Sequence, residues 1–284
     1  MSGKRRAWLV MILAVSLALG PARLAFAWGR MAHRASAKLA ESRLTPRTLE
    51  RVRLLLEPGE SLADASTWAD ENSREIPGSA SWHYVNVPIT HERYSARDCR
   101  KSGCVVSKLE EFRAILADPR SSRGDQRAAL RFVIHFVQDL HQPMHVADHD
   151  DRGGNALQLR LGRNDATNLH QVWDSGLLRT QFRHEDDLVR ALRELAAQPE
   201  ARRWHGQNVE DWANESFTLG RTAYRDPETG ALLRNGSAIS RAYERVNTPR
   251  AALRLAQAGV RLADVLNEAL GDRPGQQSPT RGSR

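Results

Sequence analysis

The sequence predicts an all-α protein, a single-domain bundle of several helices with at most a small β-hairpin. Apolar residues recur at spacings of three and four in six segments, residues 31–44, 49–56, 106–116, 130–140, 188–195 and 251–270. Strand-like patterns are confined to residues 82–87 and to residues 156–161, which follow a Gly153-Gly154 turn. No internal repeat and no interior linker rich in Pro, Gly and Ser divides the chain.

The first 27 residues have the pattern of a signal peptide. Three basic residues precede an apolar stretch over residues 7–19, and alanine stands at both positions that a signal peptidase reads before a cut after Ala27. A membrane anchor is the alternative, but this stretch is shorter than the roughly 20 residues that span a bilayer. We therefore expect cleavage after Ala27, a secreted or periplasmic protein, and Trp28 as its amino terminus.

Cleavage also changes the charge of the protein. The leader holds four Lys and Arg residues and no acidic residue, so its removal lowers the formal net charge from +8 to +4. That remaining excess favours an anionic partner. The mature chain is long enough to bury a large core in one domain, residues 28–270, while the tail over 271–284 has the composition of a disordered segment.

The chain has two cysteines, Cys99 and Cys104, with four residues between them. Export would place them in an oxidising compartment, which predicts a local disulfide. Closing so short a loop removes little chain entropy, so we expect the bridge to pin one turn. Two free thiols or half of a metal site are the alternatives, and the second Cys pair of a thiolate zinc site is missing.

Histidine and aspartate residues carry the chemical signal. His135 and Asp139 are four residues apart in an apolar segment with helical periodicity, so they share one helix face. His170 and Asp174 repeat this spacing on another predicted helix. A buried His or Asp needs a partner, and a structural His–Asp hydrogen bond would also meet that need. The repetition favours metal binding.

Other candidate ligands lie outside these two pairs. Pro143 ends the first helix, so His145 can turn back toward the His135 region. His33 follows Trp28 by five residues, near enough for the free amine, the Trp28 carbonyl and the imidazole to hold one ion.

Two further candidates stand beside large aromatic residues that could enclose a dry pocket: Asp70 in Trp-Ala-Asp and His83 in Trp-His-Tyr. The whole set has five imidazoles and three carboxylates: His33, Asp70, His83, His135, Asp139, His145, His170 and Asp174. Nitrogen and oxygen ligands without thiolate suit zinc held for hydrolysis. Since one zinc takes three or four ligands, the set predicts about three ions, with Asp139 bridging two of them.

At these residues the chain resembles the trinuclear-zinc, single-strand-specific nucleases of the S1/P1 type, which share a helical fold with bacterial zinc phospholipase C. The resemblance runs from Trp28 to about Asp174. It is carried, in family order, by the terminal Trp-Gly, Trp-Ala-Asp, Trp-His-Tyr, His-x3-Asp-x5-His, Gly-Gly-Asn and His-x3-Asp motifs.

The resemblance implies a ligand set for each of three Zn²⁺ ions. One ion would be held by Asp70, His83, His135 and Asp139. The second would be held by the Trp28 amine and carbonyl, His33 and Asp139. The third would be held by His145, His170 and Asp174.

The resemblance also implies the reaction. A metal-activated hydroxide would attack phosphorus in line in single-stranded DNA or RNA and leave products with a 5′-phosphate, with 3′-nucleotidase activity as a further expectation. Asp70, Asp139 and Asn155 would serve catalysis, with the Asn155 amide donating to the scissile phosphate. Tyr84 would stack a base; ordinary core packing is the alternative for this side chain. The resemblance implies a monomer without a stable protein partner.

Three rival functions remain open at this point. A phospholipase C on the same scaffold typically ends its ligand set with Glu, where this chain has Asp174. A non-catalytic zinc-binding protein would show dense surface histidine tracts, which the remaining five histidines do not form: His91, His141, His149, His184 and His205. Nonspecific nucleic-acid binding through charge would need a basic block, and the mature chain scatters its Lys and Arg.

Overall fold

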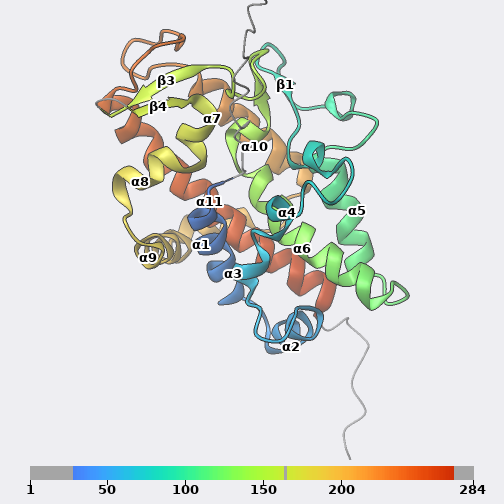
Figure 1. Cartoon of the computed structure of the whole chain (residues 1–284). Coiled ribbons are helices and arrows are strands. Elements are labelled where there is room, and N and C mark those ends of the chain that lie inside the picture. Colours follow the sequence, from blue (N-terminus) through green and yellow to red (C-terminus); the bar gives the residue numbers. More distant parts are fainter. Residues whose placement is uncertain (1–27, 163–164, 272–284) are drawn as a thin grey trace, which may run out of the picture.

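The computed structural model describes residues 28–162 and 165–271. The predicted signal peptide, residues 1–27, and the predicted tail after Gly271 lie outside the described residues. Helices dominate the described part, with two small sheets at one end (Figure 1), which confirms the predicted fold class. No helix of this part is both long and apolar enough to cross a membrane.

The helices cover most of the described chain. They are α1 Arg30–Glu41, α2 Pro46–Leu55, α3 Leu62–Ala65, α4 Trp68–Glu71, α5 Val105–Ala117, α6 Arg123–Leu140, α7 Leu169–Gln171, α8 Leu177–Gln181, α9 Glu185–Ala196, α10 Val209–Ala223 and α11 Arg241–Leu270. Tighter helical turns span Ser79–His83, Ala96–Asp98, Pro143–His145 and Pro199–Trp204, and a wider turn spans Val172–Gly176. Each of the six segments with predicted periodicity overlaps one helix: α1, α2, α5, α6, α9 or α11.

Helix α10 was not among the predicted helices, although its sequence carries two signals for it. Asn208 caps the helix by accepting a hydrogen bond from the backbone of Asp211, whose side chain bonds back to Asn208. Val209, Trp212 and Phe217 then recur at helical spacing on the buried face.

The strand expected over residues 82–87 is wrong for most of its length. A tight helical turn occupies Ser79–His83, and only β1, Val87–Pro88, pairs in parallel with β2, Ala147–Asp148. The backbone N–H of Val85 donates to the carbonyl of His145 at 2.7 Å, so this extended segment lies along the chain that follows α6. Every second residue of this segment, His83, Val85 and Val87, is buried. The strand-like pattern therefore reflects a segment with one buried side and not a regular sheet.

The second expected strand is present. Strand β3, Gln158–Leu161, pairs antiparallel with β4, Asp165–Asn168, in a hairpin at the edge of the bundle. Leu159 is buried while Gln158 and Arg160 are exposed, which is the alternation that predicted the strand.

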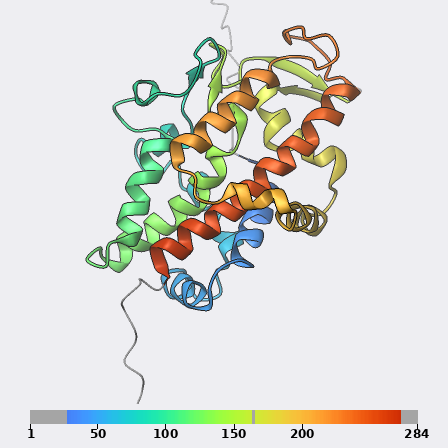
Figure 2. The same ribbon diagram turned by 180° about the vertical axis from the view of Figure 1, so that it is seen from behind.

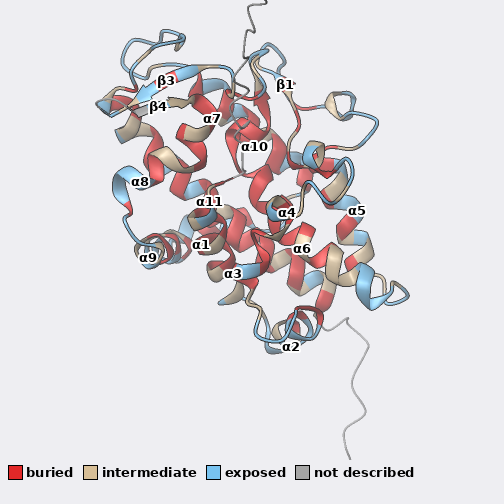
Figure 3. Ribbon diagram, viewed as in Figure 1, coloured by how far each residue is buried: buried red, intermediate tan, exposed pale blue. Residues whose placement is uncertain are grey.

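Helix α6 forms the centre of the molecule. Every residue from 132 to 140 is buried, so other parts of the protein enclose the carboxyl-terminal half of this helix on all sides. Helices α5, α10 and α11 pack around it, and the view from behind shows α10 and α11 crossing the far side (Figure 2). Buried residues gather along these inner helices while the outer turns are exposed (Figure 3).

A buried ionic cluster joins α10 and α11 to the end of α6. Arg254 and Arg261 on α11 both bind the Glu215 carboxylate of α10 at 2.6 Å. Arg261 also donates to Nε2 of His141, the residue that caps α6, at 2.8 Å, and Arg254 donates to its carbonyl. Burial opposes ionisation of Glu215, but the two guanidinium groups hold the pKa of its carboxyl below the ordinary value.

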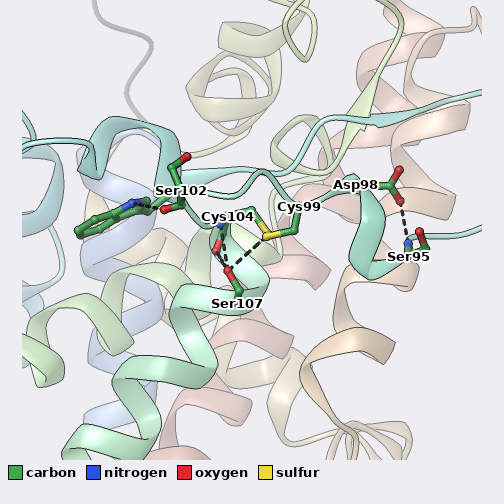
Figure 4. Close-up of a disulfide and its surroundings, with 7 residues drawn as sticks. Ser95, Asp98, Cys99, Ser102, Cys104 and Ser107 are labelled. Carbon is green, nitrogen blue, oxygen red and sulfur yellow. Dashed lines mark hydrogen bonds between the residues drawn. A yellow bond between two sulfur atoms is a disulfide. The ribbon is translucent and has the colours of Figure 1, made fainter.

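A disulfide joins Cys99 and Cys104, whose Cα atoms are 5.3 Å apart (Figure 4). It closes the turn immediately before α5, where the Ser107 hydroxyl accepts from the Cys104 backbone. Trp82 donates its indole N–H to the Ser102 carbonyl inside the same turn. The bridge therefore supports the segment that carries His83.

Replacing Glu215 with alanine is expected to lower the free energy of unfolding by about 3 kcal/mol, because two buried guanidinium groups lose their shared counter-charge. Urea unfolding followed by circular dichroism measures the change. Glu228→Ala is the matched control: its pair with Arg245 is 3.7 Å long and both side chains are mostly exposed, so the expected loss is under about 1 kcal/mol. Equal losses in both variants would contradict a stabilising role for this cluster.

Candidate metal centre

Asp139 lies at the centre of the predicted ligands. Its carboxylate is completely buried, and its two oxygens face different imidazoles. Oδ2 lies 2.9 Å from Nδ1 of His83 and 3.1 Å from Nε2 of His135, one helical turn earlier on α6. Oδ1 lies 3.5 Å from Nε2 of His33 on α1. One carboxylate thus connects two sets of nitrogen atoms.

Asp70 on the short helix α4 closes one side of this group. Its Oδ1 lies 3.4 Å from Nε2 of His135 and 3.5 Å from Nδ1 of His83. The neighbouring Trp68 packs edge-on against Phe132 of α6, which holds α4 against the central helix. This contact positions Asp70, and the dry pocket expected beside these aromatic residues stays a prediction.

A second group of ligand atoms lies beside the first. The rings of His145 and His170 stack with centroids 5.0 Å apart, and Nε2 of His170 lies 3.6 Å from Oδ2 of Asp174. Asp174 lies in the wider turn that continues α7, so the expected regular helix over this pair is only partly formed. Nδ1 of His145 lies 3.8 Å from Oδ1 of Asp139, so the two groups of ligand atoms are neighbours.

Ligand atoms come within 4.8 Å of one another in three sets. These sets are His33, His135 and Asp139; Asp70, His83 and His135; and His145, His170 and Asp174. All eight side chains predicted from the sequence are therefore brought together, although they come from α1, α4, α6, α7 and the turns around them.

Hydrogen bonds outside the cluster orient four of the five imidazoles. In each, Nδ1 donates to an oxygen: His33 to the Gln138 side chain, His135 to the Ser66 carbonyl, His145 to the His83 carbonyl, and His170 to the Gly153 carbonyl. This tautomer leaves the lone pair of Nε2 facing the cluster, as in histidines that bind metals. His83 instead turns Nδ1 inward.

Buried polar atoms without a hydrogen-bond partner mark the cluster. Among the described residues, Nε2 of His33 and Oδ1 of Asp139 have none, although both are fully buried. Burying such atoms unpaired costs several kcal/mol. A cation between them would satisfy both, and nitrogen and oxygen donors without sulfur fit zinc.

The protonation states fit the same interpretation. Burial, with a contribution from His135, lowers the pKa of His33 to about 4, and burial lowers that of His170 to about 3. Both imidazoles are then neutral at neutral pH, the form that coordinates a metal. Burial opposes ionisation of Asp139, but the adjacent imidazoles hold its pKa well below the ordinary value.

Asp174 shows the opposite shift. Burial raises the pKa of its carboxyl well above the ordinary value, although Gln142 donates to Oδ1 at 2.6 Å. A single amide donor does not offset the loss of solvation. A cation held with His145 and His170 would stabilise the ionised form.

Trp28 lies next to both groups. Its indole is fully buried and donates to the backbone carbonyl of Gln138 at 3.0 Å. The following residue, Gly29, donates its N–H to the carbonyl of Asp174 at 2.8 Å. These contacts hold the backbone of Trp28 beside α6; the role of its amine and carbonyl as ligands stays a prediction.

Tyr84 follows His83 in the chain, Asn155 follows the glycine pair that lies against His170, and both residues are partly exposed. The Asn155 amide donates to the carbonyl of Arg152 at 2.9 Å. Gly153 and Gly154 precede it with φ of 62° and 82°, and a Cβ at Gly153 would collide with the Met144 carbonyl. Glycine is therefore required where this loop approaches His170. Partial exposure of Tyr84 argues against the core-packing alternative.

The residues that support the ligands are not predicted from the sequence. Gln138 and Gln142 are fully buried, and they bind His33 and Asp174 respectively. Their signal was present, because a buried amide in an otherwise apolar helix needs a polar partner. The carbonyl of Ser66, which binds His135, carries no signal in the sequence.

Comparison with known proteins agrees with these observations. The family model described as S1/P1 nuclease matches residues 28–271. Endonuclease 2 of Arabidopsis thaliana is 30% identical over 86% of this chain and 91% of its own length. Nuclease S1 of Aspergillus oryzae is 32% identical over 60% of each chain, and nuclease P1 of Penicillium citrinum is 28% identical over 86% of this chain and 98% of its own.

The family match covers the whole described domain and begins at Trp28, the residue that precedes α1 and contacts α6. Its range includes all eight clustered side chains. The chain belongs to the S1/P1 nuclease family and is a phosphodiester hydrolase.

Proposed function

We propose that the protein is a zinc-dependent endonuclease that cleaves single-stranded DNA and RNA to products with a 5′-phosphate. The observation that carries the proposal is the Asp139 carboxylate, which is fully buried and faces separate imidazoles with its two oxygens. A shared carboxylate of this kind suits two neighbouring ions. Zinc, when bound, supplies Lewis-acid activation of water and stabilises charge on the phosphate oxygens.

The proposed ligands are the eight clustered side chains and the amino terminus, and His135, which belongs to two of the clusters, is assigned to the ion of Asp70 and His83. Asp70, His83, His135 and Asp139 would hold one ion; His33, Asp139 and the amino terminus at Trp28 a second; and His145, His170 and Asp174 a third. The outward hydrogen bonds of the Nδ1 atoms of His135, His145 and His170 support this assignment, because they orient each imidazole before an ion arrives.

Two residues at the edge would bind the substrate. Rotation of the Asn155 side chain away from the Arg152 carbonyl frees its amide to donate to an oxygen of the scissile phosphate. The partly exposed ring of Tyr84 would stack an unpaired base, and a base in a duplex cannot reach such a ring without unpairing. This contact accounts for the proposed preference for single strands.

We also propose export, on the leader pattern over residues 1–27 and on the disulfide of the mature domain. Export and activity would then be coupled, because the same cleavage would create the amino terminus at Trp28 that completes the second ligand set. The mature protein is expected to act as a monomer.

The purified mature protein should contain about three zinc ions per chain and should convert single-stranded DNA or RNA to 5′-phosphorylated products. Elemental analysis gives the metal content. Single-stranded DNA, RNA, duplex DNA and phosphatidylcholine offered in parallel separate a nuclease from a phospholipase. Fewer than about one zinc per chain after careful preparation would contradict a trinuclear centre.

Asp139→Asn should reduce the zinc content by about two ions, whereas Asp174→Asn should remove about one, because the two oxygens of Asp139 face His33 on one side and His83 and His135 on the other. Asp264→Asn is the matched control, since this carboxylate contacts His205 at the surface, 2.6 Å away, outside the three clusters. It should retain all the metal. Equal, small losses in the first two variants would argue against a bridging carboxylate.

One additional glycine before Trp28 should remove about one zinc and reduce nuclease activity at least about tenfold, because the terminal amine no longer lies at the second ligand set. Zinc content and activity are measured on the extended and the native mature protein. A glycine added after the last residue serves as the control. Full activity with a normal zinc content in the amino-terminal extension would show that the terminus matters only for export.

A further inference from the structure

A pocket of about 430 Å³ lies between the start of α1, helix α8 and the start of α9. These three elements lie together at the left of the view in Figure 1. Its lining includes Gly29, Arg30, Arg34, Asp174, Arg179 and Arg183. None of its arginines has a role in the proposed metal centre.

The pocket borders the candidate centre directly. Asp174, a member of the third ligand cluster, is one of its lining residues. Gly29 lines it as well, and its N–H binds the carbonyl of Asp174 at 2.8 Å. A chain molecule that reaches the centre from this side therefore passes over the pocket.

The two arginines on the α8 side have guanidinium groups that are free to bind a ligand. Arg179 and Arg183 are exposed, and no hydrogen bond or ion pair connects their guanidinium groups to any residue that the structure describes. The α1 side differs. Arg34 binds Asp64 at 2.5 Å and Glu185 at 3.0 Å, and Arg30 binds Glu71 in a pair whose side chains are more than half exposed.

The two acidic residues of the wall do not cancel this charge, because Asp174 is buried and belongs to the third ligand cluster. Glu185 lines the pocket, but its carboxylate is already shared by Arg34 and by Lys38, which lies 2.6 Å away. Guanidinium groups bind phosphate oxygens through paired N–H donors, and desolvation costs them less than it costs an ammonium group. An anion with several acceptor oxygens fits this wall.

We propose that the pocket is a subsite for a backbone phosphate of the substrate strand next to the scissile one, with Arg179 and Arg183 as its ligands. That the ligand is a nucleic-acid strand rests on the proposed nuclease function. The position of the subsite rests on the pocket, its free arginines and its border with Asp174. It implies that a strand long enough to reach the pocket binds more tightly than a fragment that ends at the centre.

The test compares two substrates in the holoenzyme and in the double variant Arg179→Gln/Arg183→Gln. A dinucleoside monophosphate contains only the phosphate to be cleaved, whereas a single-stranded decanucleotide also reaches the pocket. The variant should lose about tenfold in kcat/KM on the decanucleotide and nothing on the dinucleotide. The salt dependence on the decanucleotide should also weaken, by about 0.7 in the logarithmic slope for each phosphate that the variant no longer binds.

The matched control is Arg202→Gln/Arg203→Gln. These two arginines are exposed in the turn Pro199–Trp204, outside the pocket, and their replacement removes the same charge from the protein. The control should keep the wild-type kcat/KM on both substrates. Equal losses of kcat/KM in the two double variants would show that the effect comes from net charge alone, and would overturn the proposed subsite.

A binding measurement separates the subsite from catalysis. The holoenzyme is titrated with a fluorescent decanucleotide made of cleavage-resistant phosphorothioate linkages, and the fluorescence anisotropy should show weaker binding by the Arg179 and Arg183 variant than by the wild type or the control. Unchanged binding, or an equal loss of kcat/KM on both substrates, would overturn the proposal while leaving the nuclease function intact. A wild-type protein that cleaves neither substrate would instead refute the proposed function, and the anisotropy result alone would then decide the phosphate subsite.

Discussion

The burial of the Asp139 carboxylate is the constraint on which the rest of the structure depends. A fully buried carboxylate on an apolar helix is strongly destabilising unless charge or hydrogen bonds compensate it. His83 and His135 lie against one of its oxygens and His33 against the other. The chain segments before and after α6 are arranged so that their imidazoles meet this one group, which makes the metal centre and the core a single unit.

Helix α6 can hold this carboxylate in place because its own position is determined on every side. Helices α5, α10 and α11 pack around it, and the Glu215 cluster ties its carboxyl-terminal end to the two rear helices. The loops are fixed in the same way: the 99–104 disulfide supports the segment of His83, and two left-handed glycines let the 150–155 loop approach His170. A rigid scaffold keeps donors close together even where mutual repulsion would separate them.

The charges of the protein are divided between two environments. Inside, buried carboxylates and imidazoles lie close enough together to hold metal ions. Beside Asp174, four arginines line the pocket between α1, α8 and α9, which we propose as a phosphate subsite. This arrangement separates the groups that would hold metal from those that would hold phosphate, and it places positive charge close to Asp174.

The sequence by itself determined the helical class and the identity of the clustered side chains, because helical periodicity and the spacing of His and Asp are local properties. It could not determine that Gln138 and Ser66 orient His33 and His135, nor that residues 82–87 run along the chain after α6 instead of forming a regular strand. Those features depend on contacts between segments far apart in the chain. The pocket of Arg179 and Arg183 depends on both sequence and packing, since Arg179 follows Asp174 by only five residues, whereas the packing of α9 against α1 brings the distant Arg34 to the same pocket.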